Sequence, residues 1–79
     1  MAQNEGEEQI LDVRFYRCPL PVLRTRKALA SLPSGALLTV LSTDPAARID
    51  MAHFCATQGH ELIAIQEAQG VLRFVLRRG

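Results

Sequence analysis

One cysteine in the sequence is placed for chemistry: Cys18 stands directly before two closely spaced prolines, Pro19 and Pro21. Prolines are excluded from strand interiors but tolerated in the first turn of a helix, where the amide hydrogens have no partner. The segment therefore predicts a helix that begins just after Cys18. Because unpaired amides and the helix dipole stabilise a thiolate, we expect Cys18 to ionise more readily than a free cysteine.

Basic residues surround Cys18 along the chain. Between residues 14 and 27 there are five positive charges and no acid: Arg14, Arg17, Arg24, Arg26 and Lys27. A positive field favours the thiolate, and the two prolines stiffen the turn that presents the sulfur. A free cysteine is more often a small buried hydrophobe, but a connection flanked by Arg17 and two prolines argues against that alternative. The pattern thus predicts a reactive cysteine.

The second cysteine, Cys55, is expected in the core because it shares a helix face with Met51. A resolving pair with Cys18 would need a proximity that the sequence does not establish. The spacing of His53, Cys55 and His60 fits no standard zinc finger, so we expect no metal site. No glycine-rich phosphate loop is present, and we expect no cofactor.

Hydrophobic spacing predicts the elements that must position Cys18. Residues 10–13 form a short strand, residues 19–32 a helix, and residues 36–43 a strand that is apolar on both faces. Asp44 as N-cap and Pro45 as the first helical residue predict a second helix that ends at Gly59, with Asp50 also interpreted as a cap. Residues 62–65 and 71–76 are two further strands joined by a hairpin at residues 69–70.

This order predicts an α+β fold: a two-layer α/β sandwich, β-α-β-α-β-β, with a four-stranded mixed sheet and two helices on one face. Seventy-nine residues suit one domain, expected over residues 9–79 after a disordered acidic tail at residues 1–8. The tail resembles no secretory signal, and no apolar run approaches the ~20 residues that cross a bilayer. We therefore expect a cytoplasmic protein with no membrane contact. We also expect a monomer, because Arg73, Arg77 and Arg78 would discourage pairing if the last strand lay at a sheet edge.

On a helical wheel, the predicted buried face of the first helix is formed by Val22, Thr25, Leu29 and Leu32. Opposite it fall Leu20, Leu23, Arg24 and Lys27. Exposed leucines beside basic residues are typical of a protein contact patch; alternatively, the two leucines pack under the loop at Phe15. A basic stretch can also bind nucleic acid, but no stacking platform or recognition motif accompanies it. We expect no stable nucleic-acid binding.

Together these residues resemble the TusA/SirA-like sulfur carriers from about residue 9 to residue 78. The resemblance implies a sulfurtransferase in which Cys18 carries sulfur as a persulfide while Pro19 and Pro21 hold the turn. It implies a cysteine desulfurase or rhodanese-like donor and an acceptor protein serving tRNA thiolation, molybdenum cofactor assembly or sulfur oxidation. The stretches that carry it are Cys18-Pro19-Leu20-Pro21-Val22, Thr25-Arg26-Lys27-Ala28-Leu29, Gly35, Thr43-Asp44-Pro45, Asp50, Phe54-Cys55 and Gly59-His60-Glu61-Leu62.

Two positions depart from the family pattern. Phe15 stands where the family usually has glycine, so either the loop needs no positive φ here or its shape has changed. Ala52 stands where proline is frequent, which weakens the case for a helix restart at Asp50. Partner choice would then depend on the residues expected to supply an electropositive field or docking surface: Arg17, Leu20, Leu23, Arg24, Arg26 and Lys27.

Two hypotheses from other classes stay open on the sequence. The first is a regulatory or redox-sensing protein-binding module that uses Cys18 for partner contact without carrying sulfur. The second is a nucleic-acid-binding domain built on the basic stretch, which would bind RNA with a steep salt dependence.

Overall fold

The computed structural model describes residues 9–79, so the predicted acidic tail at residues 1–8 lies outside the described residues. Six elements follow in the predicted order. They are β1 (Gln9–Asp12), α1 (Leu20–Ala30), β2 (Leu37–Ser42), α2 (Ala47–Gln58), β3 (Glu61–Ala68) and β4 (Val71–Arg77).

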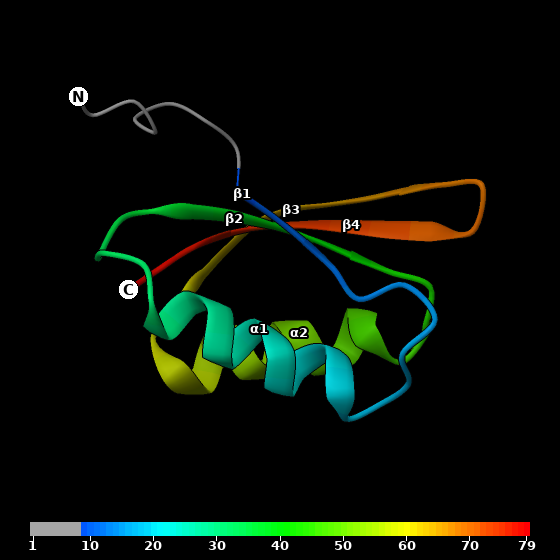
Figure 1. The fold of residues 1–79 in the computed structure, drawn as a ribbon, viewed down its shortest axis with the longest axis horizontal. Helices are drawn as coiled ribbons and strands as arrows, with labels where there is room; N and C mark the ends of the chain where they lie inside the picture. The colour runs from blue at the N-terminus through cyan, green and yellow to red at the C-terminus, as the bar shows by residue number, and fades with distance from the viewer. Residues whose placement is uncertain (1–8) are drawn as a thin grey trace.

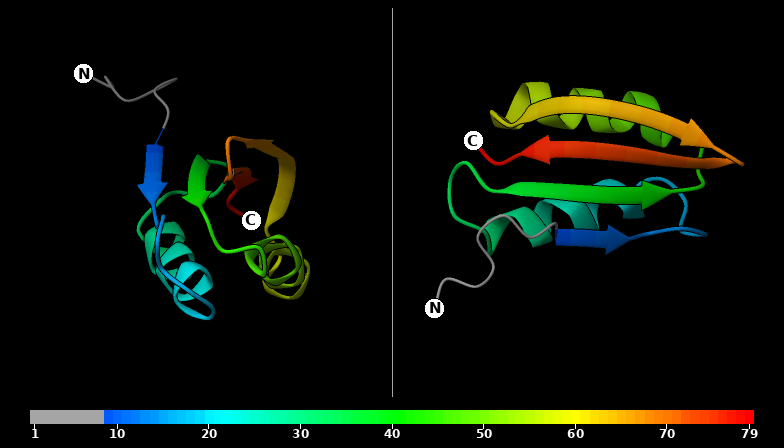
Figure 2. Two further views of the ribbon diagram at one scale, coloured as in Figure 1. Left: turned by 90° about the vertical axis from the view of Figure 1, so that its right-hand side faces the viewer. Right: turned by 90° about the horizontal axis from the view of Figure 1, so that it is seen from above.

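The strands form one mixed sheet with the order β1-β2-β4-β3. β1 pairs with β2 in parallel, and the other two pairings are antiparallel. Both helices cover the same face of the sheet, and no helix of residues 9–79 covers the opposite face (Figures 1 and 2). The predicted two-layer sandwich is therefore confirmed.

The last strand, considered above as a possible sheet edge, is an inner strand, because β4 lies between β2 and β3. Its alternating apolar residues Leu72, Phe74 and Leu76 are at most 5% exposed, because they share the face of the sheet that packs in the core. Arg77 pairs with Glu61 across the hairpin, and Arg78 Nε donates to the carbonyl oxygen of Leu29 at 2.8 Å. Arg77 and Arg78 therefore hold the C-terminal segment against other parts of the same chain. Their positions do not support the monomer prediction.

The core lies between the sheet and the two helices. Met51, Phe54 and Cys55 of α2 point into it, which confirms Cys55 as a core residue. The buried apolar residues are Val13, Leu29, Leu38, Val40, Ala47, Met51, Phe54, Cys55, Leu72, Phe74 and Leu76. Helix α1 contributes less than its spacing indicated: Val22 and Leu32 are only half-buried, whereas Pro21 is fully buried.

The two helices differ from prediction by one or two residues at their ends, and α1 stops at Ala30 instead of residue 32. Helix α1 begins at Leu20 with Pro19 as its N-cap, one residue later than expected. Helix α2 begins at Ala47, not at Pro45, and Asp44 is not its N-cap. From there α2 is continuous to Gln58, with no restart at Asp50, and Gly59 ends it with a φ of 78°, as predicted.

Candidate functional site

The site forms where two loops meet at one end of the sheet. Because β1 and β2 are parallel, the segments that follow them leave at the same end (Figure 1). The Cys18 loop, residues 13–19, precedes α1, and residues 43–46 precede α2. The Phe15 N–H donates to Thr43 Oγ1 at 2.8 Å, and the Cys18 N–H donates to Asp44 Oδ2 at 2.6 Å. These two bonds hold the loop that carries the cysteine.

Asp44 joins the two loops through both carboxylate oxygens. While Oδ2 accepts the Cys18 N–H, Oδ1 accepts the N–H of Ala46 at 3.1 Å. The Asp44 N–H donates to Ser42 Oγ at 3.2 Å, and its carbonyl oxygen accepts the Ala47 N–H at 2.9 Å. A carboxylate used in this way closes a turn ahead of the helix, which explains why α2 starts later than predicted.

Cys18 is exposed and free, as its position in a connection indicated. The expectation that it ionises unusually readily is wrong, because the pKa of its thiol is raised. The first cause is a side-chain hydrogen bond with Asp50; partial desolvation and the negative charges of Asp50 and Asp44 add to it. A carboxylate that accepts the S–H hydrogen favours the neutral thiol over the thiolate.

The start of α1 also offers the sulfur few donors. Pro19 and Pro21 have no amide hydrogen, and the N–H of Leu20 donates to the carbonyl oxygen of Arg17 at 2.8 Å. The N–H of Leu23 donates to the Pro19 carbonyl at 3.1 Å. The prolines that mark the start of the helix therefore remove the donors that would stabilise a thiolate there.

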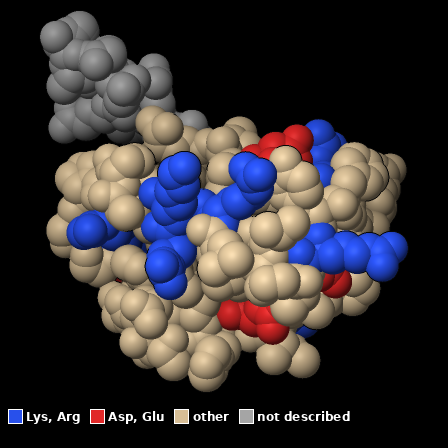
Figure 3. Space-filling model, turned by 60° about the horizontal axis from the view of Figure 1, so that its bottom comes forward, with Lys and Arg blue, Asp and Glu red and all other residues tan. Residues whose placement is uncertain are grey.

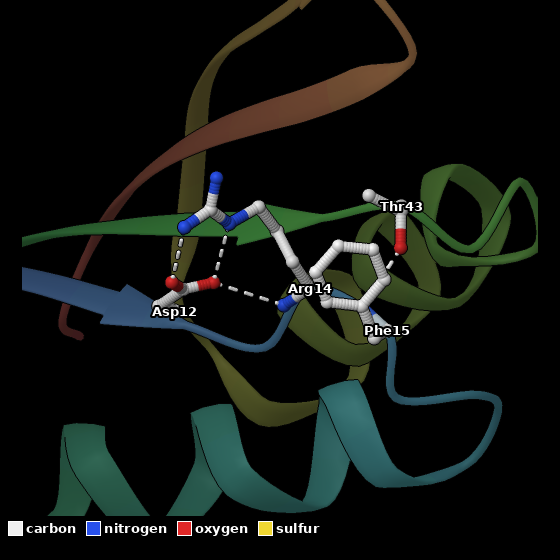
Figure 4. A network of polar contacts seen from close by, with 4 residues as sticks. All are labelled: Asp12, Arg14, Phe15 and Thr43. Atoms are coloured by element: carbon white, nitrogen blue, oxygen red, sulfur yellow. Dashed lines mark hydrogen bonds and ion pairs between the residues drawn. The ribbon is translucent and has the colours of Figure 1, made fainter.

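Two of the five basic residues near Cys18 in the sequence interact with other side chains. The Arg14 guanidinium reaches back along β1 and binds both oxygens of Asp12, at 2.9 and 2.8 Å (Figure 4). This pairing holds the pKa of Asp12 at about 2, mainly through the side-chain hydrogen bonds from Arg14. The Arg24 guanidinium lies over the Tyr16 ring, 4.5 Å from its centroid. The positive field at the Cys18 sulfur is therefore weaker than the cluster of basic residues in the sequence indicates.

The remaining predicted surface residues lie on the exposed side of α1, except Arg17, which lies in the loop before it. Arg17, Arg26 and Lys27 are exposed, and basic side chains gather on the helix side of the molecule (Figure 3). Leu20 and Leu23 are 44% and 47% exposed, and Phe15 is 84% exposed, so the leucines do not pack under the loop. An open hollow of about 360 Å³ borders the Cys18 loop; it is lined by Phe15, Tyr16, Arg17, Thr43, Asp44 and Pro45.

The conformation of Phe15, which stands where the family usually has glycine, shows whether the loop keeps a positive φ at this position. Its φ is 73°, in the left-handed region that glycine adopts without strain. The loop has kept the conformation that a glycine would favour, although a side chain in this conformation costs about 1–2 kcal/mol. The hydrogen bond from Phe15 to Thr43 helps to hold it there.

Cys55 and the histidines lie away from this site. Cys55 is 3% exposed in the core, and burial raises the pKa of its thiol. His60 fastens the C-terminus, since its Nδ1 accepts the N–H of Gly79 at 2.9 Å and its ring contacts Phe54. Over residues 9–79 no three His, Cys, Asp or Glu side chains gather as they would around a metal ion.

Sequence reasoning missed the roles of Asp44 and Asp50, which it assigned to helix capping. A signal was available in the strand–helix–strand order of the first three elements, because such an order favours parallel strands whose following loops lie at the same end of the sheet. Asp44 lies in the second of these loops, and Asp50 lies within the first turn of the helix after it. The distance along the sequence, 26 residues between Cys18 and Asp44, hides that contact.

Comparison with known proteins places the chain among sulfur carriers. The family model "Sulfurtransferase TusA" matches residues 9–78. A provisionally named sulfur carrier protein of Neisseria meningitidis serogroup A is 45% identical over 69 residues, which cover 87% of this chain and 93% of that protein. The sulfur carrier protein TusA of Pseudomonas syringae pv. syringae is 41% identical over 76 residues, covering 96% and 90%.

A solved structure gives the same fold. The crystal structure of a SirA-like protein from Desulfitobacterium hafniense superposes with a TM-score of 0.78 at 28% identity, covering 89% of this chain and 96% of that one. Within the described residues, no helix is long and apolar enough to cross a membrane.

Proposed function

Because the chain belongs to the TusA sulfurtransferase family, we propose that this sulfur carrier holds its sulfur as a persulfide on Cys18. The observation that carries the proposal is the state of Cys18: its thiol is exposed and free, and its backbone is held by Asp44 at 2.6 Å. A carrier needs one accessible sulfur on a fixed loop. Cys55, the other cysteine, is enclosed by the core.

Loading is an exchange between sulfurs. The Sγ of Cys18 attacks the outer sulfur of a persulfide on the donor protein, a new Sγ–S bond forms, and the donor's S–S bond breaks. The donor cysteine leaves as a thiolate and takes up the proton that Cys18 gives up. The exchange neither oxidises nor reduces the pair overall. Unloading repeats the step, with a thiolate of the acceptor protein attacking the outer sulfur on Cys18.

The surface around Cys18 fits docking by proteins rather than enclosure of a small substrate. Its hollow is open, and exposed apolar side chains beside exposed basic ones are typical of a contact patch. We assign docking of donor and acceptor to this surface: Arg17, Leu20, Leu23, Arg24, Arg26 and Lys27. The donor is a cysteine desulfurase or a rhodanese-like protein, and the acceptor serves tRNA thiolation, molybdenum cofactor assembly or sulfur oxidation.

Intact-mass spectrometry tests the proposal. The wild-type chain is incubated with a cysteine desulfurase and cysteine, and its mass should rise by one sulfur atom. Cys18→Ser should show no gain, whereas the matched variant Cys55→Ala, checked for folding by circular dichroism, should load like wild type. No gain in the wild-type chain, or an equal gain in Cys18→Ser, would overturn the proposal.

A further inference from the structure

Phe15 is the most exposed large apolar residue within residues 9–79, at 84%. It holds a φ of 73°, a conformation that glycine would adopt without strain. Its N–H is fixed by the bond to Thr43 Oγ1 at 2.8 Å, so the ring stands on a tethered loop (Figure 4). A side chain that adds strain and buries little surface brings no stability to the fold. Strain kept in this way points to a function for the ring.

The ring borders the open hollow of about 360 Å³ beside the Cys18 loop. Phe15, Tyr16 and Arg17 line it from this loop, and residues 43–45 line it from the loop that follows β2. Arg17 brings one positive charge to the lining and Asp44 one negative charge, and Asp44 Oδ2 already accepts the Cys18 N–H at 2.6 Å. A hollow lined by two aromatic rings and no net charge suits an uncharged, apolar side chain better than a carboxylate or a phosphate.

Tyr16 connects this hollow to the exposed side of α1. The Arg24 guanidinium lies over the Tyr16 ring, 4.5 Å from its centroid, and Lys27 follows Arg24 by about one helical turn. Leu23, next to Arg24, is 47% exposed. Helix α1 contains no acidic residue, so its surface beside the hollow combines apolar side chains with positive charge. A surface that complements it is acidic around an apolar centre.

We propose that Phe15 is a specificity-determining residue for docking: its ring and the hollow together bind an apolar side chain of a partner protein whose flanking residues are acidic. The inference rests on the proposed function, because it takes this partner to be the protein that gives sulfur to Cys18. Phe15 and Arg17 belong to the loop that carries Cys18, so a side chain seated in the hollow holds the partner next to that loop. Exposed aromatic rings beside hollows are typical anchors of protein interfaces.

Steady-state loading by a cysteine desulfurase, measured over a range of carrier concentrations, tests the inference. Phe15→Gly and Phe15→Ala should each raise the KM for the carrier about tenfold, as expected for the loss of one aromatic anchor. In both variants kcat should stay unchanged, because the ring contributes to binding and not to the transfer step. Phe15→Tyr keeps the ring and should retain the wild-type KM. Arg17→Gln should raise KM less and weaken its dependence on salt.

The controls separate docking from loop stability. Phe15→Gly relieves the backbone strain and Phe15→Ala keeps it, so an equal rise of KM in both variants assigns the effect to the ring. Leu37 is 45% exposed at the start of β2, the end of that strand away from Thr43. Leu37→Ala, checked for folding by circular dichroism, should therefore leave KM unchanged.

A peptide probe tests the docking chemistry without sulfur transfer. In an NMR titration of the ¹⁵N-labelled chain, a pentapeptide with a central phenylalanine between glutamates should shift the amide signals of residues 15–17 and 43–44. The shifts should be several-fold smaller in Phe15→Gly. They should also be smaller with two matched peptides, one with alanine in place of the phenylalanine and one with lysines in place of the glutamates.

The two readouts distinguish failure of the inference from failure of the proposed function. If the wild-type chain loads sulfur on Cys18 but Phe15→Gly and Phe15→Ala keep its KM, the inference fails and the proposed function stands. An equal rise of KM in Leu37→Ala would also overturn the inference. If Cys18 does not load while the acidic peptide binds and Phe15→Gly weakens that binding, the proposed function fails and the docking site stands. Larger shifts with a uridine oligonucleotide than with the acidic peptide would make the surface a nucleic-acid site and overturn the inference.

Discussion

Both cysteines of this chain favour the neutral thiol over the thiolate, but for different physical reasons. The pKa of each thiol is raised, at Cys55 by burial in the core and at Cys18 by the carboxylate of Asp50. Burial keeps reagents away from the thiol and also disfavours its ionised form. A carboxylate beside an exposed cysteine disfavours ionisation and leaves the sulfur accessible. The difference shows how a small domain can keep one cysteine inert and another available.

The sharpest test of this comparison is the alkylation of both cysteines in the folded wild-type chain. We expect Cys55 to react about 5,000-fold more slowly than Cys18 at neutral pH, because its labelling requires opening of the core, which costs a small domain about 5 kcal/mol. After tryptic digestion, Cys18 lies in the peptide 18–24 and Cys55 in the peptide 49–73, so one experiment gives both rates.

Urea distinguishes accessibility from intrinsic reactivity. As urea approaches the unfolding midpoint, the Cys55 rate should rise steeply, and well above it the two rates should converge. Comparable rates in the absence of urea would mean that Cys55 is not enclosed as the structure has it, and the contrast between the two cysteines would fail.

A smaller effect is expected from the strain in the Cys18 loop. Phe15→Gly removes a side chain from a left-handed conformation, φ 73°, and loses little packing because Phe15 is 84% exposed. Part of the gain is offset by the larger conformational freedom of glycine in the unfolded chain, so we expect about 1 kcal/mol or less of added stability. Urea unfolding monitored by circular dichroism measures the change.

The control for Phe15 separates strain from the loss of the ring. Phe15→Ala also deletes the ring but keeps a Cβ, so it should not gain stability. The rate of Cys18 alkylation should stay the same in both variants, because the bonds to Thr43 and Asp44 use backbone N–H groups. A gain in Phe15→Ala equal to that in Phe15→Gly would show that backbone strain is not the cause.

The smallest expected effect is the pH dependence contributed by Asp12. Its pKa is about 2 in the folded protein and near 3.8 ordinarily, so its stabilising pairing with Arg14 is present above about pH 4 and is lost as the pH falls toward 2. Asp12→Asn should therefore lower the urea midpoint slightly at pH 6, and the difference from wild type should shrink as the pH falls and vanish only below pH 2. Arg14→Gln should behave alike. A difference that persists at low pH would assign the effect to packing instead.

Much of the fold was predictable because it rests on local chemistry. Periodic apolar residues, the pairs Pro19/Pro21 and Gln69/Gly70, and the terminating Gly59 each mark a boundary or turn through their own backbone limits. Cys55 was placed correctly because its neighbours on the helix face are apolar. The position of β4 was not predictable in this way, since strand order depends on contacts between segments far apart in the chain.

The sequence by itself determined which sulfur is exposed, because Cys18 follows Arg17 and precedes two prolines that exclude it from a strand. Only the tertiary structure decided which charges act on that sulfur. The parallel pairing of β1 and β2 brings Asp44 and Asp50 to the Cys18 loop, while Arg14 and Arg24 turn to Asp12 and Tyr16. Electrostatic interactions fall off with distance in space, and neighbours along the chain are a poor measure of that distance.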